Sequence, residues 1–343
     1  MIKNLKLFFI YLFFFSLFGF ENLFSNLTNN EERLLILRNN EIVLGIWPEA
    51  GGRIVVYRYK KGRNVLLADP KQWGNKVVEP NENSHFTPYY GHNIWLGPQS
   101  DWWSQQDVNQ VRLKRKSAWP PDPYLVMGKY EIIEKTTTKV VLRSPISPIS
   151  GVQLTKTYTI GEGSHVLHEY ELVNKSKHVK KWDIWTMTRV PGRQFGYCYI
   201  GKGKKTISTD GGALPICTLN GFVYFDYLLK NAVKNPSNKL FVTPDNSLFL
   251  ATFNETTCFI KTSQKVLKTS IHPNHAACEI YQMPEKDHVF NSEPQLELEF
   301  HSRYETLRQG QKLSFKERWE LFSYEGNMNP DAHVTFLKHK LNN

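Results

Sequence analysis

The chain has 343 residues, 41% of them hydrophobic and 22% charged, and a formal net charge of +11 at pH 7. This balance is typical of a globular protein and excludes a largely disordered or fibrous chain. Its basic residues are scattered, with one compact cluster at residues 114–116. We therefore expect no nucleic-acid partner, although a basic exported protein could meet an anionic polysaccharide or membrane surface.

Residues 1–25 are predicted to be a signal peptide. Lys3 and Lys6 precede an unbroken apolar run over residues 7–20, which is short for a membrane span. Ser25 offers a small residue at a plausible cleavage point. We expect export to the periplasm, the cell surface or the medium, with membrane attachment only if this segment stays uncleaved.

The four cysteines do not form a CxxC pair, so no structural zinc site is expected. Export permits disulfides, and four thiols allow three pairings that the sequence cannot rank. Four buried free thiols are equally compatible with the pattern. The cysteines are Cys198, Cys217, Cys258 and Cys278.

Short strand-like segments, separated by turn signals, follow one another along most of the chain. They are 34–38, 41–47, 53–59, 64–68, 124–134, 139–144, 153–160, 165–174, 181–190, 221–226, 239–243, 247–254, 257–262, 276–282, 295–302 and 312–324. Helical periodicity never lasts more than about two turns, and 227–232 is the best short helix candidate. The sequence predicts one all-β domain over 30–325, a large antiparallel sandwich with few or no helices, followed by a tail over 326–343.

Residues 85–124 are predicted to be a long loop, because neither a period of 2 nor one of 3.6 runs through them. They hold four of the nine Trp residues, beside His92, Asn93, Gln99 and Asp101. Long loops in compact domains usually cover a site, and rings beside polar groups suit a sugar. The alternative is an ordered loop whose rings plug one end of the sandwich.

Polar side chains share one face of the strand at 295–302. Alternation places Glu297, Glu299 and His301 together, opposite three apolar residues. Two carboxylates on one face repel each other, so one of them should have a raised pKa if the face is enclosed. A carboxyl group of that kind can act as a general base near neutral pH. A solvated outer face is the alternative.

The strand at 181–190 repeats this pattern. Asp183, Trp185, Met187 and Arg189 lie on one face and could stack on a sugar and hold its hydroxyl groups. Ordinary surface charges beside a core Trp would give the same pattern.

Two weaker features are a glycine pair and a histidine pair. Gly51 and Gly52 precede Arg53, where a glycine pair permits a tight turn or the close approach of a ligand. His272 and His275 flank a turn and could approach a metal ion, but we predict no metal site and no cofactor.

Six segments, in their order along the chain, resemble the galactose mutarotase (aldose 1-epimerase) superfamily, and in particular an exported bacterial branch of it. The resemblance covers about residues 45–325. The segments are PEAGGRIVVYRYKKGRNVLL, GHNIWLGPQS, WPPDPY, GVQLTKTYTI, ELVNKSKHVKKWDIWTMTRV and LELEFHSRYETLRQGQKLSFKERWEL.

The resemblance implies a β-supersandwich with a sugar site on its concave face. A Glu near the C-terminus would take the anomeric proton, and it corresponds to Glu297, with Glu299 in reserve. The family's acid His has no counterpart, because Trp185 stands at its place and an indole N–H is too weak an acid. His92 would then replace it, as this branch places a His there.

The remaining site residues follow from the same resemblance. Arg53, Asn93, Gln99 and Arg189 would bind hydroxyl groups, while Trp95 and Trp185 would stack on the sugar ring. The sequence thus predicts a monomeric exported protein that binds a mono- or oligosaccharide, with aldose epimerisation by a Glu base and a His acid as the further expectation. The alternatives are a non-catalytic sugar-recognition module and a structural exported β-protein whose rings are all core.

Overall fold

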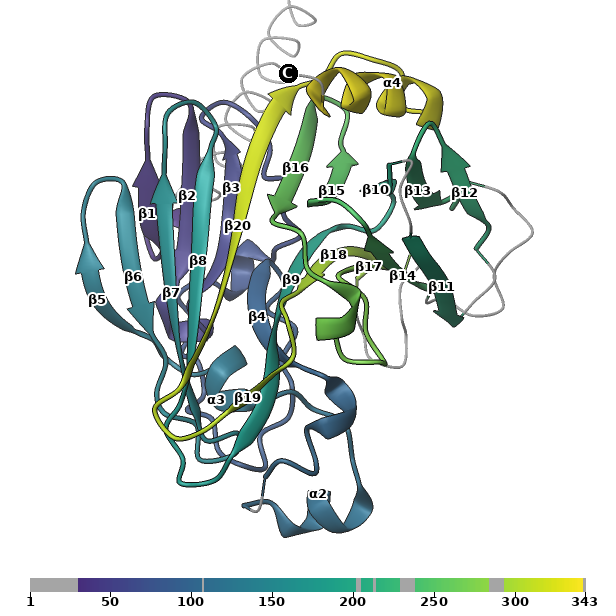
Figure 1. Ribbon diagram of the computed structural model, residues 1–343. Coiled ribbons are helices and arrows are strands. Elements are labelled where there is room, and N and C mark those ends of the chain that lie inside the picture. Colours follow the sequence, from purple (N-terminus) through teal and green to yellow (C-terminus); the bar gives the residue numbers. More distant parts are fainter. Residues whose placement is uncertain are drawn as a thin grey trace, which may run out of the picture.

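The computed structural model describes residues 30–106, 108–201, 205–211, 214–228, 238–283 and 293–341. Their strands form two antiparallel sheets of ten strands each, which pack face to face (Figure 1). The predicted all-β sandwich is confirmed. Hydrophobic side chains from both sheets fill the space between them.

The first sheet has the order β1-β2-β3-β4-β9-β18-β17-β14-β11, with β19 paired to β9. Its strands are β1 (Leu35–Arg38), β2 (Ile42–Trp47), β3 (Arg53–Tyr59), β4 (His92–Gly97), β9 (Lys180–Pro191), β11 (Lys205–Gly211), β14 (Asn238–Pro244), β17 (Cys278–Met283), β18 (Gln295–His301) and β19 (Glu305–Leu307). Strands β4, β9 and β18 at its centre are buried on both faces almost throughout. Polar residues can occupy such a buried face beside apolar ones, but each buried polar group then needs a hydrogen-bond partner.

The second sheet has the order β12-β13-β10-β15-β16-β20-β8-β7-β6-β5. Its strands are β5 (Glu131–Lys135), β6 (Lys139–Arg143), β7 (Val152–Ile160), β8 (Val166–Asn174), β10 (Gly196–Tyr199), β12 (Ile216–Leu219), β13 (Phe222–Phe225), β15 (Leu248–Phe253), β16 (Thr257–Ser263) and β20 (Lys312–Ser323). Strand β7 alternates between buried and part-exposed residues, which is the pattern of a sheet with one solvated face.

The helices are short and lie at the ends of the sandwich (Figure 1). They are α2 (Gln110–Arg115), α3 (Pro123–Val126) and α4 (Pro330–Leu341), with single 3-10 turns η1 (Pro48–Ala50), η2 (Pro70–Gln72), η3 (Gln99–Asp101) and η4 (Lys268–Ser270). No helix in the described part of the chain is both long and apolar enough to cross a membrane.

Several predicted segments differ from the structure. The loop predicted over 85–124 contains strand β4 and helix α2, and β4 shows no period of 2 because both of its faces are buried. The segment 64–68 forms no strand, and 124–134 divides into α3 and β5. The helix candidate 227–232 lies mostly outside the described residues, which place only its first two residues, in a turn.

Helix α4 lies within the segment expected to be a tail, and it packs on a second hydrophobic cluster. His333, Val334 and Leu337 are buried there, and the His333 ring stacks on Phe253 with centroids 4.0 Å apart. The Nδ1 atom of His333 lies 2.9 Å from the hydroxyl of Tyr197. A histidine so placed is held in its neutral form.

We predict that His333 in α4 makes the stability of the folded protein depend on pH. Burial lowers the pKa of His333 from 6.5 to about 4, so the unfolded chain binds the additional proton between those pH values. The melting temperature should therefore fall as the pH is lowered from about 7 toward 4. His333→Gln should show a shallower fall than the wild type in thermal denaturation at matched pH values, and parallel curves would contradict the prediction.

Candidate functional site

Register between the central strands defines two faces of the first sheet. Arg189 pairs with Glu297, Met187 with Glu299, and Trp185 with His301 across β9 and β18. Alternation within each strand, which the sequence predicted, and this register together place the six side chains on one face. We call it the outer face, because it is turned away from the second sheet.

The outer face continues across β17 and β14 to β11. Glu279 lies beside Glu299, Phe241 beside Glu279, and Ser208 beside Phe241. Side chains from segments far apart in the sequence thus share one surface.

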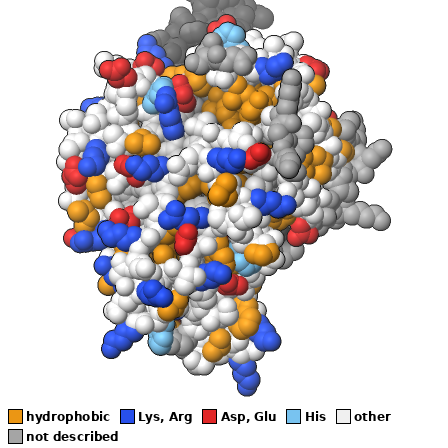
Figure 2. All heavy atoms as spheres, viewed as in Figure 1, with side chains coloured by type: hydrophobic (Ala, Val, Ile, Leu, Met, Phe, Trp, Pro, Cys, Tyr) orange, Lys and Arg blue, Asp and Glu red, His pale blue; other side chains and the backbone are white. Residues whose placement is uncertain are grey.

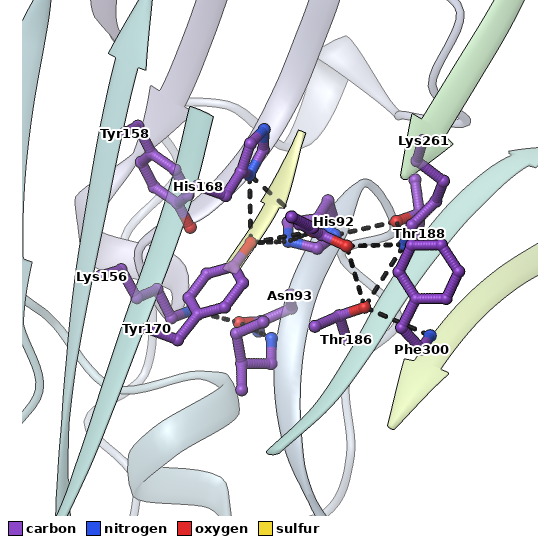
Figure 3. Close-up of polar contacts among 12 residues, drawn as sticks. His92, Asn93, Lys156, Tyr158, His168, Tyr170, Thr186, Thr188, Lys261 and Phe300 are labelled. Carbon is purple, nitrogen blue, oxygen red and sulfur yellow. Dashed lines mark hydrogen bonds and ion pairs between the residues drawn. The ribbon is translucent and has the colours of Figure 1, made fainter. Parts of the chain in front are cut away.

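His92 lies on the opposite face, which corrects its predicted role. It pairs with Thr188, one residue before Arg189, and so points toward the second sheet. Its Nδ1 lies 2.9 Å from Thr188 Oγ1 and its Nε2 lies 2.8 Å from the Tyr170 hydroxyl, with no part of the ring exposed (Figure 3). His92 and Glu297 point to opposite sides of the sheet, so the prediction that they face each other across a sugar is wrong.

The surroundings of His92 form a buried polar network between the sheets (Figure 3). The Tyr170 hydroxyl donates to Glu317 Oε1 at 3.0 Å, and Lys261 Nζ lies 3.1 Å from Glu317 Oε2. Burial and the Lys261 charge hold the pKa of both His92 and His168 well below the usual range. Tyr170 and Glu317 link His92 to Lys261, while the buried Nε2 of His168 has no hydrogen-bond partner among the described residues. The linked groups give the network a structural character.

Arg53 and Asn93 also have structural roles rather than the predicted sugar contacts. The guanidinium of Arg53 is buried and donates to the carbonyl oxygens of Ala50, Tyr90 and Val126. Asn93 donates to the Val126 carbonyl and accepts from Lys156 Nζ. The glycine pair explains this arrangement, because a Cβ on Gly51 would lie 2.3 Å from the Val126 carbonyl oxygen.

Rings of the segment 85–124 pack on the outer face instead of lining an open cleft. Trp95 and Trp102 are buried, with centroids 5.6 Å apart, while Trp119 is 42% exposed. The guanidinium carbon of Arg189 lies 5.3 Å from the Trp95 ring, and Arg189 Nε lies 2.7 Å from Glu297 Oε1. These rings therefore agree with the alternative prediction, in which an ordered segment packs its rings against the sandwich instead of binding a ligand. Gln99 is half-buried in η3.

Trp185 joins the ring cluster to a network of charged groups. Its indole N–H donates to Glu299 Oε2 at 2.7 Å, and its ring stacks on His301. Lys239 Nζ lies 2.8 Å from Glu299 Oε2 and 2.7 Å from Glu279 Oε2. The predicted reserve base, Glu299, therefore sits in a network that the sequence did not indicate.

Two histidines meet the same Glu279 carboxylate. His275 Nδ1 lies 2.8 Å from Glu279 Oε1, and His301 Nε2 lies 3.4 Å from that oxygen. Asp183 Oδ1 lies 3.1 Å from His301 Nδ1 and so orients the ring. Sequence reasoning noted His275 in its turn and His301 and Asp183 on their strands. It missed Glu279 and Lys239, because only pairing between β14, β17 and β18 brings them together.

Burial and neighbouring charges shift the pKa values of this network. Burial, together with Glu279 and Glu297, raises the pKa of Glu299 to about 7 although Lys239 opposes it. This agrees with the predicted repulsion between the two carboxylates of β18. Burial disfavours a charged His301, but Glu279 and Asp183 outweigh it and raise its pKa to about 10.

An open hollow of about 350 Å³ adjoins the network where β11 and β14 meet the segment that follows η4. His275 belongs to both the network and the wall of the hollow. The residues that line the hollow are Thr206, Ser208, Thr209, Phe241, Thr243, Lys268, Ile271, His272, Pro273, Asn274, His275 and Ala276. A second hollow of about 490 Å³ shares Thr206, Thr243 and Lys268 with it. Glu297 and Glu299 are not among the described residues that line either one.

Two groups of histidine and carboxylate in the described residues have the spacing of metal ligands. One is His92, His168 and Glu317 between the sheets, and the other is His275, Glu279 and His301 on the outer face. No metal site was expected from the sequence, where no CxxC pair occurs and only the pair His272 and His275 could approach a metal ion. The structure brings His275 together with Glu279 and His301 instead.

The two facing sheets define a galactose mutarotase-like β-sandwich. A galactose mutarotase-related enzyme from Lactobacillus acidophilus aligns with a TM-score of 0.51 and 8% identity, over 86% of this chain and 99% of that one. A galactose mutarotase-like protein from Lactobacillus casei aligns with a TM-score of 0.49 and 12% identity, over 84% and 100%. At such identities the likeness concerns the fold alone.

The chain belongs to the family described as Domain of unknown function (DUF4380), whose model matches residues 32–322. A comparison with curated protein sequences gave no significant match.

The buried pair between the sheets generates a prediction about stability. Glu317→Gln should lower the free energy of unfolding by about 3–5 kcal/mol, because it leaves the Lys261 charge buried without its partner. Glu320→Gln is the matched control on β20, since its partner His165 is part-exposed and such pairs contribute about 0–1 kcal/mol. Urea denaturation would measure the free energy of unfolding of both variants. Equal decreases in the two would contradict a stabilising charge pair between Glu317 and Lys261.

Proposed function

We propose that this chain is an exported carbohydrate-binding protein whose ligand occupies the hollow on the outer face. The observation that carries the proposal is an open space of about 350 Å³ beside a buried histidine and carboxylate network, in a mutarotase-like fold. A space of this size is at the lower end for small-molecule sites, which suits a single sugar ring.

The lining of the hollow supports a sugar in particular. The ring of Phe241 offers an apolar face, and hydroxyl and amide groups of Thr206, Ser208 and Asn274 surround it. Sugars present the same combination of an apolar ring face and a hydroxyl rim. The second hollow, which shares three lining residues with the first, gives room for a further sugar unit.

Surface charge supports a sugar over nucleic acid. On the face shown in Figure 2, Lys and Arg side chains are spread among Asp and Glu side chains rather than gathered into one patch. Nucleic-acid sites usually need a continuous basic stripe. The apolar run over residues 7–20 supports export, and it lies outside the described residues.

We predict that Phe241→Ala weakens sugar binding while the fold is kept. The dissociation constant should rise at least about tenfold, which corresponds to about 1.4 kcal/mol of lost ring contact. Calorimetric titration with a panel of neutral and acidic sugars would measure it. Phe322→Ala, which removes a half-buried ring from β20, is the control. Equal sugar affinities of the two variants would show that the sugar does not bind in the hollow.

An aldose epimerase is the second candidate, and His275 favours it. Its ring lines the hollow and is oriented by Glu279 at 2.8 Å, the arrangement of a general acid or base held by a carboxylate. The proposed pair of His275 and Glu279 replaces the predicted pair of His92 and Glu297.

Epimerisation predicts a rate effect at His275. Exchange between sugar anomers, followed by NMR, should slow by about 10²–10⁴-fold in His275→Asn, since proton transfer by a positioned side chain contributes about that factor. His165→Asn is the matched control, because His165 pairs with Glu320 at 2.7 Å on the second sheet, away from the hollow. If the wild type exchanges anomers no faster than buffer, the protein is a binding module alone.

A further inference from the structure

A second property of the outer-face network does not depend on sugar binding. His275, Glu279 and His301 each offer one ligand atom, and these atoms lie within 4.8 Å of one another. Two imidazoles and one carboxylate are a frequent ligand set for divalent zinc and neighbouring transition metals. We propose that these three side chains bind one divalent transition-metal ion, with zinc as the representative cation.

The separations between ligand atoms fit such an ion. Zinc binds nitrogen and oxygen at about 2.0–2.2 Å, so neighbouring ligands of a tetrahedral ion lie about 3.4 Å apart. His301 Nε2 and Glu279 Oε1 are 3.4 Å apart, which exceeds a normal hydrogen bond but matches that spacing. His275 Nδ1 and Glu279 Oε1 are 2.8 Å apart, so they would separate by roughly half an ångström on binding.

His301 supplies a second indication of a ligand. Among the described residues, its fully buried Nε2 makes no hydrogen bond of normal geometry and has only the ion-pair contact with Glu279 Oε1 at 3.4 Å, although buried polar atoms nearly always have a hydrogen-bond partner. Its Nδ1 is held by Asp183 at 3.1 Å. A carboxylate on the far nitrogen of a metal-binding histidine fixes the ring and increases its basicity.

The charges around the cluster also suit a divalent cation. The carboxylates of Asp183, Glu279 and Glu299 are fully buried, and the Lys239 ammonium accompanies two of them. The His301 ring lies between Glu279 and Asp183 and is a second cationic partner of these carboxylates. A divalent ion would take the place of the proton on His301 Nε2 and keep the carboxylates neutralised.

The ion would be reachable from solvent. His275 lines the hollow, so a fourth coordination position would face this space and could hold water or a sugar hydroxyl. The cluster of His92, His168 and Glu317 has no such opening, because all three side chains are fully buried and Tyr170 already bridges them.

The test is zinc binding by the untagged full chain after treatment with a chelator. Calorimetric titration with zinc chloride should give one equivalent bound to the wild type. Affinity should fall by more than about 100-fold in His301→Gln and in His275→Asn, since even an outer carboxylate contributes about 10–100-fold. His165→Asn should bind like the wild type, because its pair with Glu320 lies elsewhere.

Two outcomes would overturn the proposal: no binding of zinc to the wild type, or equal binding by the wild type and His275→Asn. His275 is half-buried, so this variant decides the matter should His301→Gln not fold. Phe241→Ala should keep its zinc while losing sugar, which separates this proposal from the proposed function. Zinc should also suppress any anomer exchange, because a metal-bound His275 has no lone pair left to move a proton.

Discussion

Coverage of the first sheet on both faces is the constraint on which the rest of the structure depends. The second sheet covers one face, and rings from residues 85–124 with the segment after η4 cover much of the other. The charged residues in the middle of β9, β17 and β18 are therefore buried and must bind one another. A buried charge without a partner would cost several kcal/mol, so each network has to be complete or has to recruit a ligand.

The two faces meet this constraint in different ways. On the inner face, Tyr170 and Glu317 bind His92 and Lys261, and the network is enclosed between the two sheets. On the outer face, Glu279 contacts Lys239, His275 and His301, and His275 opens the network to a hollow. A network enclosed between two sheets stabilises a fold, whereas one that opens to a hollow can exchange protons or hold a cation. This difference is why the proposed function and the proposed metal site both lie on the outer face.

Much of the sandwich could be predicted from the sequence. Alternation indicated most strands and placed Glu297, Glu299 and His301 on one face, because side-chain direction in a strand repeats every two residues. The same reasoning failed for β4, where polar and apolar residues are all buried and leave no period to read. Helix α4 was missed because its stability comes from packing on the second cluster more than from its own pattern.

By itself the sequence determined the fold class, the sharing of faces within single strands, and the neighbouring position of Glu297 and Glu299. Burial, which only the tertiary structure supplies, is the main cause of the raised pKa of Glu299. Which strands lie side by side was decided only in the tertiary structure, because register is set by long-range pairing. His92 pairs with Thr188 rather than with its neighbour Arg189, and this difference of one residue places the His92 side chain on the opposite face of the sheet. Pairing of β14 and β17 with β18 likewise brings Glu279 and Lys239 to His301, although about 20 to 60 residues separate them along the chain.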